Sequence, residues 1–150
     1  MMTDHADVHR LVAARLDSAG QVYTDKRRTL VELLAQVGPC TLPELLEAGE
    51  GIAQSSAYRN LTVLADMGVV RRLVHGGDHG RWELAEELTG HHHHLVCDGC
   101  GVVIDVELPV DVEEVMDHAF NAAASAAGFT VAHHNVDILG QCADCGIAAR

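Results

Sequence analysis

The chain has 150 residues, of which 48% are hydrophobic but only 3% aromatic, and its formal net charge is -12. This composition excludes a disordered tail and predicts one or two small globular domains. No cationic start precedes an apolar run, and no stretch approaches about 18 apolar residues. We therefore expect neither export nor membrane insertion, and a cytoplasmic protein.

The charge is unevenly distributed along the chain. Residues 1–81 hold nine Lys and Arg against ten Asp and Glu, or about -1, whereas residues 82–150 hold one against twelve, or -11. Neutralisation of phosphates by Lys and Arg supplies much of the affinity for DNA, so an acidic chain would ordinarily argue against nucleic acid. Since the acidity belongs to the second half, the first half remains able to bind a polyanion.

Helical spacing and capping residues predict a helical first half that ends in a hairpin. Thr24 can cap the second helix, which Gly38-Pro39 would end. Thr41 and Glu44 form a capping box for the third, and Ser55 or Ser56 would cap the fourth. The expected helices span 4–19, 24–37, 41–49 and 55–67, and the expected hairpin consists of strands 69–75 and 81–84 joined by a turn at 76–78.

This order of elements is typical of a winged helix-turn-helix, although an ordinary helical domain followed by a hairpin would have the same order. The inner face of the fourth helix would carry small and aliphatic residues, namely Ala57, Leu61, Leu64 and Ala65. The outer positions, which favour groove binding, are Ser56, Tyr58, Arg59 and Thr62. Among these, Arg59 is the candidate for contact with phosphate or guanine.

The second half predicts a small α+β unit behind a polar hinge at residues 86–90. Strands are expected at 95–96, 102–106 and 130–139, and an alanine-rich helix at 112–127. A unit of some 60 residues buries a marginal core. It would therefore benefit from a metal or from a partner subunit.

Four of the five cysteines form two C-x-x-C pairs, Cys97 with Cys100 and Cys142 with Cys145. The pairs fall at the two ends of the predicted β-α-β unit, and two such knuckles brought together supply the four thiolates that structural zinc prefers. A redox pair is the competing interpretation, but two matched pairs favour zinc. Cys40, the fifth cysteine, is typical of a buried small apolar group.

Four consecutive histidines, His91 to His94, precede the first of these pairs. In an extended stretch His91 and His93 face one way while His92 and His94 face the other, which offers two separate ligand pairs. A solvated polar run is the alternative. Each pair would need further ligands to complete a divalent site. The candidates are Glu83, Asp105, Glu107, Glu113, Glu114, Asp117, His118, His133, His134 and Asp137.

Three segments together resemble the ferric uptake regulator family of metal-sensing repressors: residues 82–84, 91–101 and 140–145. The stretch 56–61, Ser-Ala-Tyr-Arg-Asn-Leu, is similar to that family's recognition helix, so the resemblance covers most of the chain from about residue 24. It implies an α+β fold with a winged helix-turn-helix DNA-binding domain at 1–85, a hinge at 86–90, and a small α/β metal-binding and dimerisation domain at 91–150.

The resemblance also implies three metal sites. A structural zinc would lie on Cys97, Cys100, Cys142 and Cys145, and a regulatory divalent metal (Zn, Fe, Mn or Ni) on Glu83, His92, His94 and Asp105. A second inter-strand site would use His91, His93 and His134 with either Glu113 or Asp117. The family often supplies a further histidine near Pro39-Cys40, where this chain has none, so Cys40 is a possible substitute. In the basic segment, Lys26 and Arg27 are the candidate phosphate contacts, although Thr24-Asp25-Lys26-Arg27 replaces the family's usual proline and glutamine.

The implied function is a homodimeric, metal-dependent transcriptional repressor that binds palindromic double-stranded DNA and controls genes of metal homeostasis, with no enzymatic activity and no membrane partner. A peroxide-sensing repressor of the same family, which would oxidise a ligating histidine, is the nearest alternative. A metal-buffering protein and a metallo-hydrolase are the more distant ones. The chain lacks the H-E-x-x-H and G-x-S-x-G motifs that would support hydrolysis.

Overall fold

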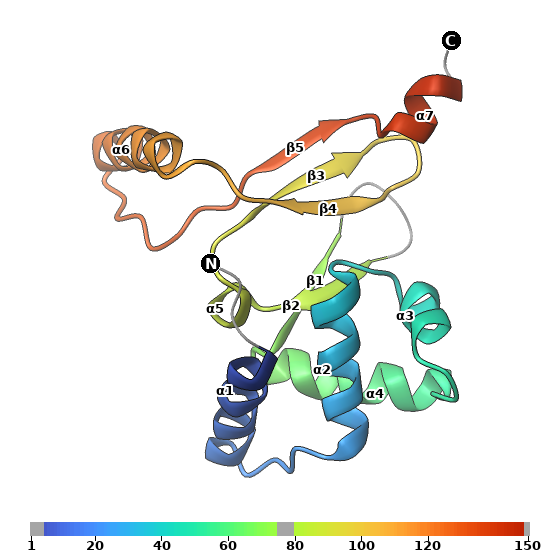
Figure 1. Cartoon of the computed structure of the whole chain (residues 1–150). Coiled ribbons are helices and arrows are strands. Elements are labelled where there is room, and N and C mark those ends of the chain that lie inside the picture. Colours follow the sequence, from blue (N-terminus) through green and yellow to red (C-terminus); the bar gives the residue numbers. More distant parts are fainter. Residues whose placement is uncertain (1–4, 75–79, 149–150) are drawn as a thin grey trace.

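The computed structural model describes residues 5–74 and 80–148. Its N-terminal part contains the expected helices, and it ends in an antiparallel hairpin (Figure 1). Buried aliphatic side chains from all of these elements form one continuous core, in which Leu16, Leu30, Leu45, Leu61 and Leu64 are among the most buried. The elements are α1 (His5–Ser18), α2 (Asp25–Val37), α3 (Leu42–Ala48), α4 (Gln54–Asp66), β1 (Val70–Leu73) and β2 (Arg81–Leu84).

Two of the three predicted helix caps are present. The Thr24 side chain accepts a hydrogen bond from the Arg27 backbone, and Thr41 and Glu44 form the reciprocal capping box of α3. The cap predicted at Ser55 or Ser56 is wrong, because α4 begins earlier, with Ala53 in the N-cap position and no side-chain cap. The first turn of α4 lies at the surface, where water can satisfy its amide groups.

The hairpin is shorter than predicted in its first strand. Strand β1 ends at Leu73, and its partners in β2 run from Val70 opposite Leu84 to Leu73 opposite Arg81. The predicted turn at 76–78 lies outside the described residues. This register places Arg71 directly opposite Glu83.

The segment predicted as a polar hinge contains a short helix, α5 (Glu86–Thr89), which packs against α1. Its anchor is Leu88, which is 1% exposed and belongs to the N-terminal core. Burial of this apolar side chain stabilises the contact of the segment with the N-terminal part. The chain then turns at Gly90, which has a φ of 95°.

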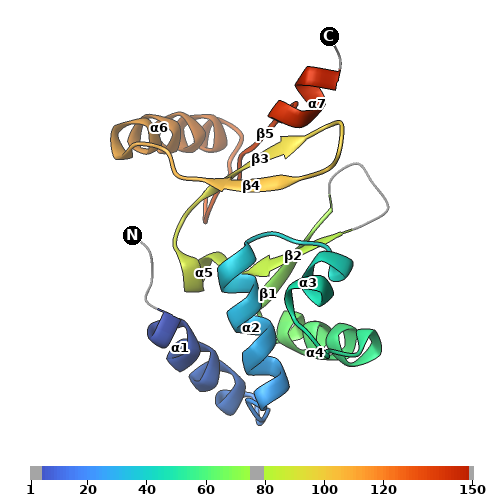
Figure 2. The ribbon, with the colours of Figure 1, turned by 45° about the vertical axis from the view of Figure 1, so that its right-hand side comes forward.

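The second sheet has the order β4-β3-β5 and is formed by β3 (His93–Cys97), β4 (Val103–Val106) and β5 (Asp137–Gly140). Strand β3 runs antiparallel to β4 and parallel to β5, with α6 (Val110–Ala126) in the connection between β4 and β5. Figure 2 shows α6 to one side of this sheet, and none of its residues is buried.

The boundaries of the second half differ from the expected ones. Strand β3 begins earlier than predicted and includes two of the four histidines, while only the end of the predicted strand 130–139 is extended, as β5. A final helix, α7 (Ala143–Ala148), was not predicted. The α+β class and the order of helices, hairpin and α/β unit are confirmed. Within the described residues, none of the helices is long and apolar enough to cross a membrane.

Candidate metal centres

The two C-x-x-C pairs meet at one edge of the second sheet. Because β3 and β5 are parallel, their carboxyl ends lie together, and Cys97 is in register with Gly140 just before the second pair. The four cysteine sulfurs all lie within 4.8 Å of one another. Gly99 is needed for this close approach, since a side-chain carbon there would lie 2.8 Å from Cys145 Sγ. The set is consistent with a structural zinc site.

The thiols of this cluster differ in acidity. Backbone amides of Cys142 and Cys100 lower the pKa of Cys97 to about 6, whereas the neighbouring sulfurs of Cys142 and Cys97 raise the pKa of Cys145 to about 12. Four negative sulfurs repel one another at this spacing, so protons are retained on some of them. A divalent cation would remove that conflict and take the place of the protons.

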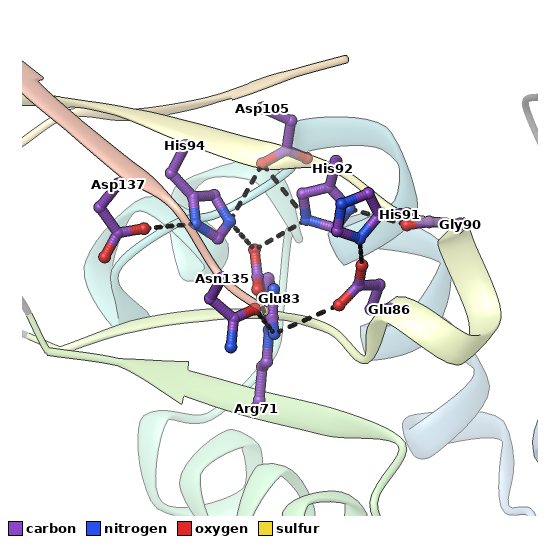
Figure 3. A network of polar contacts seen from close by, with 10 residues as sticks. All are labelled: Arg71, Glu83, Glu86, Gly90, His91, His92, His94, Asp105, Asn135 and Asp137. Atoms are coloured by element: carbon purple, nitrogen blue, oxygen red, sulfur yellow. Dashed lines mark hydrogen bonds and ion pairs between the residues drawn. The ribbon is translucent and has the colours of Figure 1, made fainter. Parts of the chain in front are cut away.

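A second cluster lies between the hairpin and the second sheet (Figure 3). Glu83 is on β2, His94 is on β3 opposite Asp105 of β4, and His92 lies just before β3. Glu83 Oε2 is 3.0 Å from His94 Nε2 and 3.7 Å from His92 Nε2, and Asp105 Oδ1 is 3.7 and 3.8 Å from the same two nitrogens. Ligand atoms from the hairpin and from the second sheet or the segment before it therefore converge within 4.8 Å.

The outer contacts of the two histidines hold their Nε2 atoms toward the centre of this cluster. His92 Nδ1 lies 2.9 Å from the Gly90 carbonyl oxygen, and His94 Nδ1 lies 3.1 Å from Asp137 Oδ1. Such partners fix the tautomer and orientation of metal-ligating histidines. His92 Nε2 is buried and has no hydrogen-bond partner among the described residues, which fits a position that a divalent metal would fill.

A third cluster lies on the other face of the histidine run, as the alternation predicted. His93 Nε2 is 2.7 Å from Glu113 Oε1, and Glu113 Oε2 is 3.5 Å from both His91 Nε2 and His134 Nε2. These four residues have ligand atoms within 4.8 Å of one another. Asp117 contacts the opposite nitrogen, His134 Nδ1, at 3.1 Å. The structure thus brings Glu113 into the cluster and places Asp117 behind His134.

The model of the ferric uptake regulator family matches residues 18–139. The chain belongs to this family. It is a transcription regulator and not an enzyme.

Two kinds of relatives show how close the similarity is. The peroxide operon regulator of Bacillus subtilis is 29% identical over 135 residues, covering 87% of this chain and 88% of the relative, and the peroxide-responsive repressor PerR of Staphylococcus epidermidis is 29% identical over 139 residues, covering 88% and 86%. The structure of the Vibrio cholerae ferric uptake regulator is 27% identical, with a TM-score of 0.69 and coverage of 87% of this chain and 98% of that one.

The charges around the regulator's Glu83 compensate one another. Burial acts to raise the pKa of this carboxyl group, but the imidazoles of His92 and His94 and the guanidinium of Arg71 outweigh it and lower the pKa to about 2. The Glu83 carboxylate in turn raises the pKa of His92 to about 9, and it raises the pKa of His94 as well. Glu83 is thus ionised and neutralised by cations before any metal binds.

Metal binding at this cluster should strengthen as the pH rises. A histidine binds metal only when it is neutral, and with a pKa of about 9 in the metal-free regulator His92 is protonated at neutral pH. Binding must therefore release a proton, and the affinity for Mn(II) should increase by up to about tenfold per pH unit between pH 7 and 8.5. Calorimetric titrations in two buffers of different ionisation enthalpy would measure the released proton. An affinity that stays constant over this range would contradict His92 as a ligand.

Cys40 lies apart from the three clusters. It is 4% exposed within the N-terminal core, and its backbone pairs with that of Trp82. Burial raises the pKa of its thiol to about 11, which disfavours the thiolate that binds metal. The structure therefore does not place Cys40 at the regulatory cluster, and it supports the interpretation as a small apolar core residue. Glu107, Glu114, His118 and His133 also lie outside the clusters found among the described residues.

The predicted DNA-facing residues of α4 lie at the surface. Tyr58, Arg59 and Thr62 are exposed and Ser56 is half-buried, while Ala57 and Leu61 on the opposite side are in the core. The Tyr58 ring packs edge-on against Trp82, with ring centroids 6.3 Å apart, which ties the helix to the hairpin. The outer face of this helix is therefore available to enter a groove.

The two basic candidates at the start of α2 differ. Lys26 is exposed. Arg27 is engaged within the protein, where its guanidinium donates hydrogen bonds to the Asn60 side chain at 3.2 Å and to the Val22 carbonyl at 2.6 Å. Arg27 thus connects the start of α2 to α4, and Lys26 is the more exposed of the two.

Two arginines of the hairpin contact groups around the metal clusters and were not predicted as site residues. Arg71 contacts Glu83, and Arg81 donates to the Gly101 carbonyl beside the first cysteine pair and to Glu44 of α3. The position of Arg71 could have been found from the hairpin, since residues opposite each other in an antiparallel pair interact. The contacts of Arg81 connect distant segments and had no such local signal.

Proposed function

We propose that this regulator is a peroxide-responsive, metal-dependent repressor that binds palindromic DNA as a dimer. The proposal is carried by the cluster of Glu83, His92, His94 and Asp105, in which one ligand comes from the hairpin next to the recognition helix and three come from the second sheet or the segment before it. A divalent metal held by all four would couple the position of the DNA-binding half to that of the second half.

The second sheet supports dimer formation. Regulators of this family bind DNA as dimers. Here Leu95 is in register with Ile104 on one side and Ile138 on the other, so the three form an apolar row across all three strands. Each of these side chains is at least 40% exposed. An exposed apolar row of this kind favours contact with a second copy, which would set the spacing of the two recognition helices.

The donor set supports iron as the regulatory metal in a peroxide sensor. Imidazole and carboxylate ligands without a thiolate suit Fe(II) and Mn(II), and relatives of similar length are named as peroxide regulators. Fe(II) held by Glu83, His92, His94 and Asp105 would supply the electron-transfer chemistry that cleaves the O–O bond of hydrogen peroxide, and it would regain its electrons from the imidazole that is oxidised. In the net reaction one peroxide oxygen would be added at the C2 carbon of His92 or His94 while the C2 hydrogen moves to a ring nitrogen, giving 2-oxohistidine, and the other oxygen would leave with both peroxide hydrogens as water. The altered imidazole can no longer complete the cluster, so DNA is released.

Peroxide treatment of the DNA complex tests this proposal. With Fe(II) bound, we expect hydrogen peroxide to release a palindromic operator fragment and to add one oxygen atom to the peptide that contains residues 91–94, as measured by mass spectrometry. The Mn(II)-loaded protein should remain on DNA and keep its mass, because Mn(II) does not reduce peroxide in this way. A metal-dependent complex that survives peroxide without oxygen addition would instead indicate a regulator of metal uptake.

A further inference from the structure

Arg71 contacts the regulatory cluster from the side opposite to Asp105 (Figure 3). Its Nε donates to Glu83 Oε1, and its Nη1 lies 3.4 Å from Asn135 Oδ1 and 4.0 Å from Glu86 Oε2. The guanidinium is thus held by groups from β2, from α5 and from the segment before β5. A planar guanidinium with several partners is fixed in position more firmly than a flexible ammonium would be.

The two carboxylate oxygens of Glu83 have different partners. Oε1 accepts the hydrogen bond from Arg71, whereas Oε2 faces His94 Nε2 at 3.0 Å and His92 Nε2 at 3.7 Å. Glu83 is 3% exposed, so water does not compete for either oxygen. Only Oε2 is directed toward the point where the ligand atoms converge.

We infer that Arg71 is a positioning residue that limits Glu83 to a single metal-ligating oxygen and so keeps part of the metal's coordination sphere open. The inference rests on the proposed function of the cluster. Carboxylates bind divalent ions through one or both oxygens, and an oxygen held by a guanidinium is withheld from the metal. Removing Arg71 would allow Glu83 to bind through both oxygens.

The neighbouring turn adds no donor that would close the site. A side-chain carbon at Gly38 would lie 3.9 Å from Asp105 Oδ2, but glycine has none, and Cys40 is in the core. Among the described residues the cluster offers four donor side chains, and ions that prefer six ligands would complete their shell with water or with peroxide. Arg71 thus keeps the site accessible to peroxide. As a cation beside the metal, it also lowers the affinity of the regulatory cluster for that metal.

Mn(II) binding without DNA or peroxide tests this role. All samples carry Glu113→Gln, which removes the carboxylate that contacts His91, His93 and His134 and so weakens Mn(II) binding at that cluster relative to the regulatory one. In Arg71→Met we expect Mn(II) to bind about tenfold more tightly, because a cation beside the metal is removed. Water-proton relaxation should show about one exchangeable water fewer on the bound Mn(II) than in the parent, because Glu83 Oε1 replaces it. The parent itself should keep at least one such water.

Matched variants separate this role from a structural one. Arg72→Met removes the same charge from the next position of β1, where the side chain lies over the Trp82 ring, and should leave both quantities unchanged. Arg71→Lys retains a cation that can donate to Oε1 and should restore the water number of the parent. An unchanged water number or weaker Mn(II) binding in Arg71→Met, or the absence of any exchangeable water in the parent, would overturn the inference. If Glu83→Gln leaves Mn(II) binding unaffected, the regulatory cluster itself is wrong and both proposals fail.

Discussion

His92→Ala is expected to abolish the metal response of DNA binding. The truncation should remove a metal ligand whose Nε2 has no hydrogen-bond partner among the described residues, although it also removes a cation that helps to neutralise Glu83 in the metal-free protein. The operator affinity in saturating Mn(II) should fall by about 100-fold, to the level without metal, because coupling between two sites reaches about this size. Fluorescence anisotropy of an operator duplex, titrated with and without Mn(II), measures both states.

Two variants make this result specific. His118→Ala changes an exposed histidine of α6 that is outside the three clusters, and it should keep the full metal response. Arg59→Ala should retain Mn(II) affinity but lose DNA affinity whether or not metal is present, because the exposed guanidinium on α4 is expected to contact DNA directly. A His92→Ala protein that still binds DNA more tightly with Mn(II) would contradict the proposed switch.

Cys97→Ser is expected to unfold the second half of the chain. Three strands and an α6 without any buried residue leave this part with few buried apolar side chains, mainly Val96 and Val103. Structural zinc contributes folding free energy directly, and losing one of four ligands should destabilise this part by about 5 kcal/mol or more. We expect one zinc fewer per chain by elemental analysis and the loss of amide protection in β3 and β5 by hydrogen exchange.

Cys40→Ser is the matched control for this substitution. It makes the same chemical change at a buried thiol of the N-terminal core, which should cost modest stability and leave the zinc content unchanged. If Cys97→Ser retained zinc and the protection of β3, the four cysteines would not be a structural site. Equal zinc loss in both variants would point to Cys40 as a ligand.

The helical half was predictable because its signals are local. Helical spacing of leucines and the caps at Thr24 and Thr41 act over a few residues, and the structure shows helices at each expected place. The short helix within the predicted hinge at 86–90 had no local signal, because Leu88 anchors it to the N-terminal core and α5 contacts α1, which is far away in sequence. The strand at 130–139 was predicted too long because its hydrophobic pattern does not show where pairing with β3 begins.

The candidate metal sites also combine features that local patterns predicted with features that contacts between distant segments decided. The alternation of an extended chain by itself separated His91 and His93 from His92 and His94, and the C-x-x-C spacing indicated zinc. The choice of Glu113 over Asp117 depended on how α6 lies beside β3, and the position of Cys40 depended on the core around Trp82. Neither could be read from spacing, because both are set by contacts between segments that are distant in the chain.

The acidic charge of the chain is placed by the sequence, but the groups that neutralise it are placed by the fold. The sequence alone determined that the charge of -12 lies almost wholly in the second half, together with the cysteines and histidines that would bind metal. Only the tertiary structure decided that Glu83, besides facing Arg71 in the hairpin, is also matched by His92 and His94, because folding brings the separate histidine segment against the hairpin. Charge is additive along a chain, but the free energy of a charge depends on which groups surround it after folding.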